Sequence, residues 1–222
     1  AAAQAAGASH FVLLSALCVQ KPQLAFQHAK LAFEQALMRS GMDYSIVRPT
    51  AFFKSLSGQV ARVKAGKPYL LFGDGRLTAC KPISDRDLAE FLAGCLEDPA
   101  RRNRILPIGG PGPALTPREQ GEQLFALLAS PARFRQIPLG VIELAVTILA
   151  GASRIFPRLR DKAEFARIAR YYATESMLVW NTAEQCPDAE ATPSTGNDRL
   201  VDYHAELLNR TDAVLRSDHS LF

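Results

Sequence analysis

Cysteine and histidine are scarce in this chain, and neither residue type is clustered. Four cysteines (Cys18, Cys80, Cys95 and Cys186) and four histidines are spread over 222 residues, and no two cysteines form a C-x-x-C pair. Structural zinc sites, iron–sulfur ligation and redox dithiols use closely spaced ligands, so the sequence argues against them. Free cysteines fit a reducing compartment. His28 lies within a helical pattern, and we interpret it as a surface residue.

A strong excess of one charge is also missing. The net charge is +4, and the basic residues are scattered apart from short clusters at 101–104 and 158–162. No stripe of basic and aromatic residues points to nucleic acid, so we predict no nucleic-acid partner. A few of these charges could still meet an anionic cofactor or a substrate that carries propionate groups.

Long apolar runs are few, and none is a clear membrane span. The longest, residues 138–156, is borderline in length, contains Glu143 and is bracketed by Pro138 and Pro157. A carboxylate is costly at the centre of a bilayer. We interpret the segment as an apolar helix that packs on the domain or lines a pocket, and a peripheral membrane contact is the alternative.

An early glycine-rich turn is absent as well. Dinucleotide-binding folds usually open with a strand, such a turn and a helix, which hold the pyrophosphate on backbone N–H groups. The only dense glycine cluster is GGPG at 109–112, which comes late and contains a proline without an N–H donor. We interpret this cluster as a strand-to-helix connection. The chain is therefore expected to be the C-terminal part of a longer protein, whose preceding part carries the first strands and the adenine half of a cofactor site.

The sequence does contain a strand–helix–strand pattern near its start. The apolar run 11–14 predicts a short buried parallel strand, and an amphipathic helix follows over 24–39, ending at Ser40 and Gly41. A second strand is predicted over 44–47. This order is typical of an α/β fold in which a helix connects two parallel strands.

Polar side chains follow both predicted strands. Ser15 ends the first strand, and Arg48, Pro49 and Thr50 close the second. The C-terminal ends of parallel strands form the edge where open α/β sheets bind ligands. On the intervening helix Lys30 follows Phe26 by one turn, so the two share a helix face.

Later segments predict further elements. A short helix with loops is expected over 51–65 and a β-hairpin over 69–80. Capping boxes start two helices, Ser84 with Asp87 for 86–96 and Thr116 with Glu119 for a helix to residue 128. The remaining predictions are a strand at 105–108, helices at 139–150, 161–178 and 200–216, and a loop at 185–197.

Four segments carry a family resemblance: GASHFVLLSALCVQKP, YSIVRPTAFFKSL, FGDGRLTACKPIS and LPIGGPGPALTPREQGE. Together they resemble the 8-vinyl reductases of divinyl chlorophyllide, which belong to the atypical short-chain dehydrogenases related to the isoflavone reductases. The resemblance extends from about residue 7 to about residue 177. It implies the C-terminal portion of a Rossmann-type parallel sheet over 1–110, an NADP-binding part with substrate-pocket insertions, and a mainly helical substrate-binding part over 111–222.

The resemblance implies NADPH as cofactor and reduction of the 8-vinyl group of divinyl chlorophyllide or protochlorophyllide to ethyl in chlorophyll biosynthesis. It also implies a tetrapyrrole substrate and a peripheral contact with the thylakoid membrane or a photosynthetic complex. The location would be the chloroplast in a plant or alga and the cytoplasm in a bacterium. Short-chain dehydrogenases usually place a tyrosine where this chain has Phe26. The conjugated macrocycle can accept negative charge itself, so a phenolic acid is not required.

Site roles follow from the same resemblance. The catalytic candidates are Lys30 and Ser15; the cofactor-binding candidates are Ser15, Lys30, Arg48, Pro49 and Thr50; the substrate-binding candidates are Phe26, Phe52, Phe53 and Lys54. Each has a structural alternative: Lys30 could be a surface lysine, Arg48 an anchor, and the phenylalanines core residues. Either Tyr171 or Tyr172 could replace the missing acid.

Two rival functions fit the same features. The chain could belong to a non-catalytic relative that binds a pigment or a protein subunit of a photosynthetic assembly. It could instead belong to a reductase of other conjugated small molecules, such as plant phenolics. The segments RPTAFFKSL and IGGPGPALTP count against the second rival. A glycine-rich turn upstream of this chain would favour the enzyme over the first rival.

Overall fold

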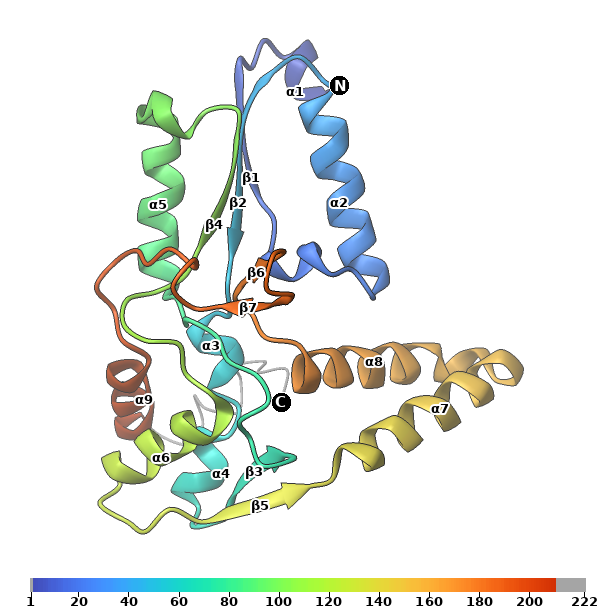
Figure 1. The fold of residues 1–222 in the computed structure, drawn as a ribbon, viewed down its shortest axis with the longest axis vertical. Coiled ribbons are helices and arrows are strands. Elements are labelled where there is room, and N and C mark those ends of the chain that lie inside the picture. The colour runs from blue at the N-terminus through green and yellow to red at the C-terminus, as the bar shows by residue number, and fades with distance from the viewer. Residues whose placement is uncertain (1, 211–222) are drawn as a thin grey trace.

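A three-stranded parallel sheet organises the first half of the chain. The structure, a computed structural model, describes residues 2–210. The strand order is β1 (His10–Leu14), β2 (Asp43–Pro49) and β4 (Arg104–Ile108). Helix α2 (Ala25–Met38) lies on one side of the sheet and α5 (Asp85–Glu97) on the other (Figure 1). The predicted parallel strand–helix–strand unit is therefore confirmed.

Strand β1 is less buried than its sequence predicted. It pairs only with β2 among the described residues, so it is an edge strand there, and Leu14 is 41% exposed. The central strand β2 takes the buried position instead, with Ser45, Ile46 and Val47 all inaccessible. An unbroken apolar run fits both situations, so the pattern could not tell a central strand from an edge strand.

The capping box predicted for α6 (Pro117–Leu127) is confirmed, whereas the start of α5 has the Ser84 N-cap bond without the reciprocal bond to Asp87. The Ser84 hydroxyl accepts from the Asp87 N–H at 3.0 Å at the start of α5. In α6 the Thr116 hydroxyl accepts from the Glu119 N–H at 3.3 Å, and Glu119 accepts from the Thr116 N–H at 2.7 Å. These bonds satisfy N–H groups that have no partner within the helix.

The lower part of the molecule is built around a second sheet that the sequence did not reveal. Strand β3 (Tyr69–Phe72) pairs in parallel with β5 (Phe134–Ile137), so the predicted hairpin over 69–80 is wrong. The segment after the Gly73–Gly75 turn does not pair with β3. The Gly75 carbonyl accepts from the Arg118 N–H, and the backbone of Cys80 pairs with that of Leu115.

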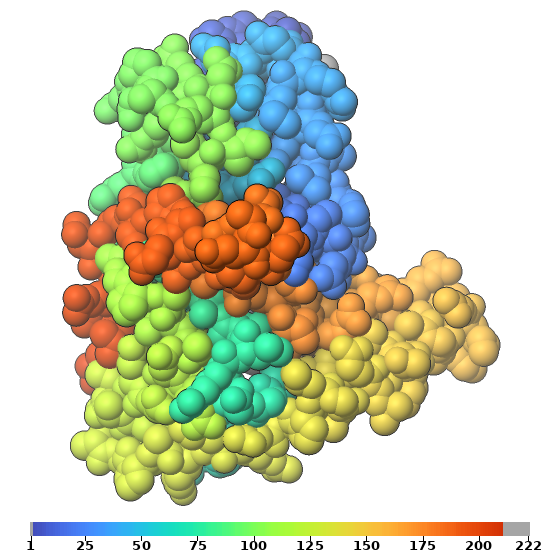
Figure 2. All heavy atoms as spheres, in the orientation of Figure 1, coloured from blue at the N-terminus to red at the C-terminus, as the bar shows by residue number. Residues whose placement is uncertain are grey.

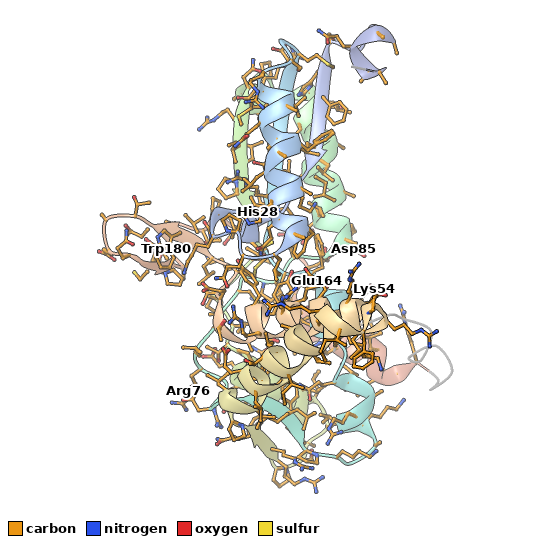
Figure 3. The ribbon with its side chains drawn as sticks, turned by 90° about the vertical axis from the view of Figure 1, so that its right-hand side faces the viewer. His28, Lys54, Arg76, Asp85, Glu164 and Trp180 are labelled. Carbon is orange, nitrogen blue, oxygen red and sulfur yellow. The ribbon has the colours of Figure 1, made fainter. Side chains whose placement is uncertain are left out.

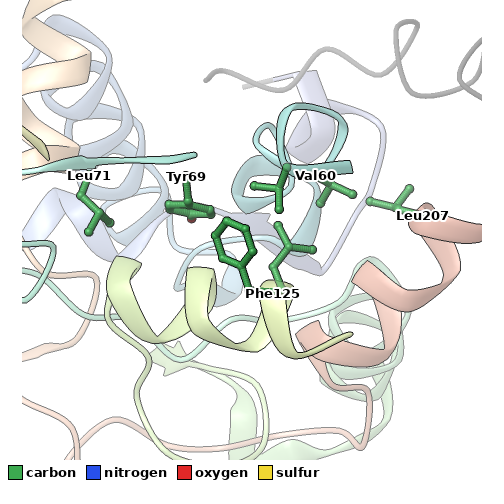
Figure 4. Packing of buried hydrophobic residues seen from close by; sticks show 7 residues of the cluster. Val60, Tyr69, Leu71, Phe125 and Leu207 are labelled. Atoms are coloured by element: carbon green, nitrogen blue, oxygen red, sulfur yellow. The ribbon is translucent and has the colours of Figure 1, made fainter. Parts of the chain in front are cut away.

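Helices α4 (Val60–Lys64), α6 and α9 (Leu200–Asn209) close over this sheet (Figure 4). The cluster they share is Val60, Val63, Tyr69, Leu71, Leu124, Phe125 and Leu207. It joins residues from both sides of the predicted boundary at residue 110. Shorter elements are α1 (Ala2–Ala5), η1 (Leu17–Gln20), α3 (Phe53–Leu56), η2 (Pro99–Arg101) and η3 (Pro157–Leu159).

The C-terminal half is less purely helical than predicted. Helices α7 (Leu139–Ile155) and α8 (Arg160–Thr174) form a hairpin that projects from the body (Figures 1 and 2). Beyond α8, β6 (Val179–Asn181) and β7 (Cys186–Asp188) form an antiparallel pair, the second within the predicted loop. Their position is marked by Trp180 in Figure 3. No helix of the described chain is long and apolar enough to cross a membrane. The last predicted helix is observed to Asn209, and its remainder falls outside the described residues.

The 109–112 cluster is confirmed as a connection between β4 and α6. Gly109 donates to Pro193 at 2.8 Å, and a Cβ on Gly110 would overlap the Pro82 carbonyl group. The glycines therefore allow three chain segments to meet backbone to backbone.

We expect Gly110→Ala to lower the free energy of unfolding by about 1–3 kcal/mol, because the added methyl group must displace a backbone carbonyl. Gly151→Ala is the matched control. Gly151 lies in α7 with open space around it, so that change should stabilise the protein by up to about 1 kcal/mol. Urea unfolding of both variants measures the difference, and equal effects would contradict the packing explanation.

A second stability prediction concerns His204 on α9. The ring is buried, its Nε2 has no hydrogen-bond partner among residues 2–210, and burial lowers the pKa of His204 from 6.5 to about 4. As pH falls below 6.5 the unfolded chain binds a proton that the folded chain refuses until about pH 4. The free energy of unfolding should therefore be retained above pH 6.5 and decrease through this window, by at most about 1.4 kcal/mol per pH unit. Urea unfolding against pH measures it, and His204→Leu should remove this share of the slope.

Candidate active site at the end of strand β1

A pocket of about 250 Å³ lies at the C-terminal end of β1, between the strand and α2. Its lining residues are Leu13, Leu14, Ser15, Ala29, Lys30 and Phe33. The two predicted catalytic residues, Ser15 and Lys30, thus share one pocket although they come from different elements. The pocket is open and mostly apolar, and Phe33 at its wall is 49% exposed.

Lys30 directs its ammonium group toward the strand end. Its Nζ donates to the Leu14 carbonyl oxygen at 3.4 Å. An ammonium group has three donors, so two remain for other partners in the pocket. This donor set suits a neighbouring sugar with hydroxyl groups. Phe26, one turn earlier, is half-buried and packs against the apolar cluster that lies below β1.

Ser15 belongs to a buried polar network that sequence reasoning did not find. Its hydroxyl donates to Glu34 Oε1, and Arg48 holds the same carboxylate with two donors, Nε at 3.0 Å from Oε1 and Nη2 on Oε2. Ser15 is 4% exposed and Glu34 is 1% exposed. The ion pair fixes the hydroxyl, and since the hydrogen of Ser15 is engaged, its oxygen can serve a ligand only as an acceptor.

Glu34 was detectable in principle. It lies four residues after Lys30, on the same face of α2 that carries Phe26, and Arg48 ends the neighbouring strand. A carboxylate on the buried face of an amphipathic helix needs a cationic partner. Arg48 therefore takes its predicted alternative role as an anchor, and its side chain does not reach into the pocket lining.

Thr50 and Pro49 are also occupied by the fold. Thr50 is buried, its hydroxyl donates to the Lys81 carbonyl, and its N–H donates to Ile108 at 2.9 Å. Pro49 is buried at the end of β2. Any contact of this segment with a nicotinamide ring would therefore come from main-chain atoms rather than from the Arg48 or Thr50 side chains.

The predicted substrate wall is largely part of the core. Phe53 is 4% exposed and its ring lies 5.7 Å from that of Tyr203 on α9, which is the core position named as its structural alternative. Phe52 is half-buried and packs against a different cluster that contains Val47 and Ile83. The two adjacent side chains therefore have different neighbours, Tyr203 for Phe53 and the Val47–Ile83 cluster for Phe52. Lys54 is exposed on α3 (Figure 3).

An apolar cluster below β1, called the floor cluster here, connects α8 to the site. The cluster comprises Leu17, Cys18, Leu24, Cys80, Tyr171 and Met177, with Phe26 and Tyr172 packed against it. The Tyr171 hydroxyl donates to the Cys18 carbonyl at 3.0 Å, and burial raises the pKa of Tyr171. Burial also raises the pKa of Tyr172 to about 12. Both phenols are therefore neutral near pH 7, and Tyr171 is already engaged.

Two further predictions can be compared with the structure, those for the Ser84–Asp87 cap and for His28. Ser84 caps α5 as predicted, whereas the Asp87 carboxylate accepts from the N–H groups of Asn197 and Asp198 at 3.1 and 2.9 Å instead of capping the helix. His28 is exposed on α2, as the sequence predicted (Figure 3). Glu175, near Tyr171 in the sequence, accepts from Lys21 at 2.8 Å.

The parallel sheet, its flanking helices and the pocket at a strand end define a Rossmann-type NAD(P)-binding fold. A family described as NAD(P)H-binding matches residues 1–99. An NADPH-dependent quinone oxidoreductase from Escherichia coli has the same fold, with a TM-score of 0.63 at 14% identity, covering 94% of this chain and 69% of that one.

Over most of its length the chain is homologous to divinyl chlorophyllide a 8-vinyl-reductases of plants. It is 55% identical to the chloroplastic reductase of Cucumis sativus over 208 residues, which are 91% of this chain and 50% of the relative. It is 54% identical to that of Oryza sativa subsp. indica over 212 residues, 93% of this chain and 52% of the relative. The chain therefore spans about half the length of the curated relatives that it matches.

Proposed function

We propose that the protein containing this chain reduces the 8-vinyl group of divinyl chlorophyllide or protochlorophyllide to an ethyl group with NADPH, within the chloroplast. The observation that carries this proposal is the identity of more than half of the residues to reductases of that name over nine-tenths of the chain. The pocket with Ser15 and Lys30 supplies a place for the chemistry.

The reduction adds one hydride and one proton across the vinyl double bond. NADPH, when bound, supplies the hydride and leaves as NADP⁺. In this proposal Lys30 donates to the nicotinamide ribose through the ammonium hydrogens that Leu14 does not take. Ser15, held by Glu34, accepts a hydrogen bond from the carboxamide side of the nicotinamide. The 48–50 segment adds only main-chain contacts.

The proton has no assigned donor. The proposal does not need an acid at the Phe26 position, because the conjugated macrocycle accepts the negative charge that develops. Water can then protonate the second carbon, and Tyr172, a neutral phenol at the edge of the floor cluster, is a side-chain candidate. Phe26 provides an apolar surface for the planar ring, and the exposed Lys54 would meet a propionate group.

A tetrapyrrole substrate is largely apolar, so the proposal includes a peripheral contact with the thylakoid membrane or a photosynthetic complex that holds the pigment. The test is an assay of the purified full-length protein with divinyl chlorophyllide and either NADPH or NADH. We expect monovinyl product with NADPH, resolved by chromatography. Pigment binding without any conversion would overturn the proposal and support the non-catalytic rival.

A further inference from the structure

Helix α7 carries an exposed apolar stripe. Val141, Leu144, Ile148 and Ile155 are 54%, 61%, 58% and 74% exposed. At 100° per residue these four positions fall within an arc of about 60°, so they form one continuous row along a helix of about 25 Å. Exposed rows of large aliphatic side chains in a folded protein indicate a surface that meets another apolar phase.

The stripe faces away from the candidate active site. Ile142, which is buried, and Leu149, which is half-buried, mark the side of α7 that packs along α8. That side lies about 120° around the helix from the stripe. Helix α8 contributes Tyr171 and Tyr172 to the floor below β1, whereas the three buried clusters of residues 2–210 contain no α7 residue. The stripe therefore lies on the side of α7 turned away from α8, in a hairpin that projects from the body of the molecule (Figures 1 and 2).

The tip of the hairpin combines apolar and basic side chains. Phe156 is 60% exposed next to Ile155, and Phe165 is 51% exposed on the first turns of α8. Residues 154–162 contain four cations, Arg154, Arg158, Arg160 and Lys162, against the single anion Asp161. Within residues 2–210 none of these four cations forms an ion pair. Their charge is thus available to an anionic surface.

We propose that the α7–α8 hairpin docks on an anionic lipid bilayer. Ile155, Phe156 and the α7 stripe enter the boundary between headgroups and acyl chains, while the basic residues of the tip bind lipid phosphates. Apolar burial and attraction of basic side chains to anionic headgroups act together in such interfacial contacts. A membrane fits this surface better than a protein groove does, because the row ends in a projecting tip with four cations and a single anion.

This inference deepens the membrane contact in the proposed function by assigning it to particular residues. It does not rest on vinyl reduction, and its test reads binding rather than turnover. Failure of the reductase assay would leave it standing, and failure of lipid binding would leave the reductase assignment standing.

The test is flotation of the full-length protein with vesicles of phosphatidylcholine, with or without phosphatidylglycerol. We expect binding only to the anionic vesicles. The double variant Ile155→Ser and Phe156→Ser, and separately Arg158→Glu with Arg160→Glu, should each weaken binding at least about tenfold. Matched controls are Leu77→Ser with Leu96→Ser, both exposed apolar residues elsewhere, and Lys67→Glu with Arg76→Glu. The controls should bind as the wild type does.

Equal binding by tip variants and controls would overturn the proposal, as would equal binding to neutral vesicles. Light scattering after gel filtration tests whether a second copy of the protein covers the stripe instead of a membrane. A dimer that the Ile155 and Phe156 changes dissolve would assign the surface to a second copy of the protein and also overturn the proposal. Circular dichroism confirms that each variant is folded before flotation is read.

Discussion

Replacing Lys30 with methionine is expected to lower kcat/KM for vinyl reduction by about a hundredfold or more. Methionine keeps an unbranched apolar side chain and removes the ammonium group. In the proposed site that group holds the nicotinamide ribose, and loss of one such positioned donor typically costs a factor of this size. The measurement is the steady-state assay of the full-length protein with divinyl chlorophyllide and NADPH.

The His28→Met variant is the matched control for this experiment. His28 lies two residues earlier on α2, is exposed and is not among the residues that line the pocket. Its activity should equal that of the wild type. Lys30→Arg keeps a cation but changes its donor geometry, so partial activity is expected. If Lys30→Met were as active as the His28 control, Lys30 would be the ordinary surface lysine that its spacing alone also allows.

The local elements of this fold were predictable because each depends on neighbouring residues. Apolar periodicity predicts the β1–α2–β2 unit. Gly41, with a positive φ of 76°, marks the end of the helical segment, and capping side chains mark the starts of α5 and α6. Such signals are complete within a few residues of sequence.

What the sequence could not provide is pairing between distant segments. Strand β3 joins β5 across more than sixty residues, and no local pattern distinguishes that partner from a hairpin partner at 77–80. Phe52 and Phe53 illustrate the same limit at the level of side chains. Both are apolar and adjacent, yet Phe52 packs against Val47 and Ile83 while Phe53 lies against Tyr203, and only tertiary structure separates a core position from a pocket wall.

Part of the candidate site could be predicted from local sequence, and part depended on contacts between distant elements. Ser15 and Lys30 stood out by position at a strand end and on a helix face, and the structure places both at one pocket. Glu34 did not stand out, because its role depends on the direction in which Arg48 points from the next strand. A buried ion pair is a property of two elements together.

Replacing Glu34 with alanine is expected to lower the free energy of unfolding by about 3–5 kcal/mol. The change leaves Arg48, whose side chain is only 16% exposed, without its carboxylate, and it removes the acceptor of the Ser15 hydroxyl. The free energy comes from urea unfolding followed by circular dichroism. The control is Glu164→Ala, which removes an exposed partner of Arg167 at 3.2 Å and should cost no more than about 1 kcal/mol.

A double replacement distinguishes the effect of an unpaired buried charge from the effect of lost side-chain volume. Glu34→Leu with Arg48→Met exchanges both charges for apolar side chains, so no uncompensated charge remains buried. The double variant should therefore be more stable than Glu34→Ala although it carries more changes. It should also lose activity, because Ser15 would no longer be oriented by a carboxylate. A Glu34→Ala variant no less stable than the Glu164 control would show that the network does not hold the strand end, and Ser15 would then need another explanation for its burial.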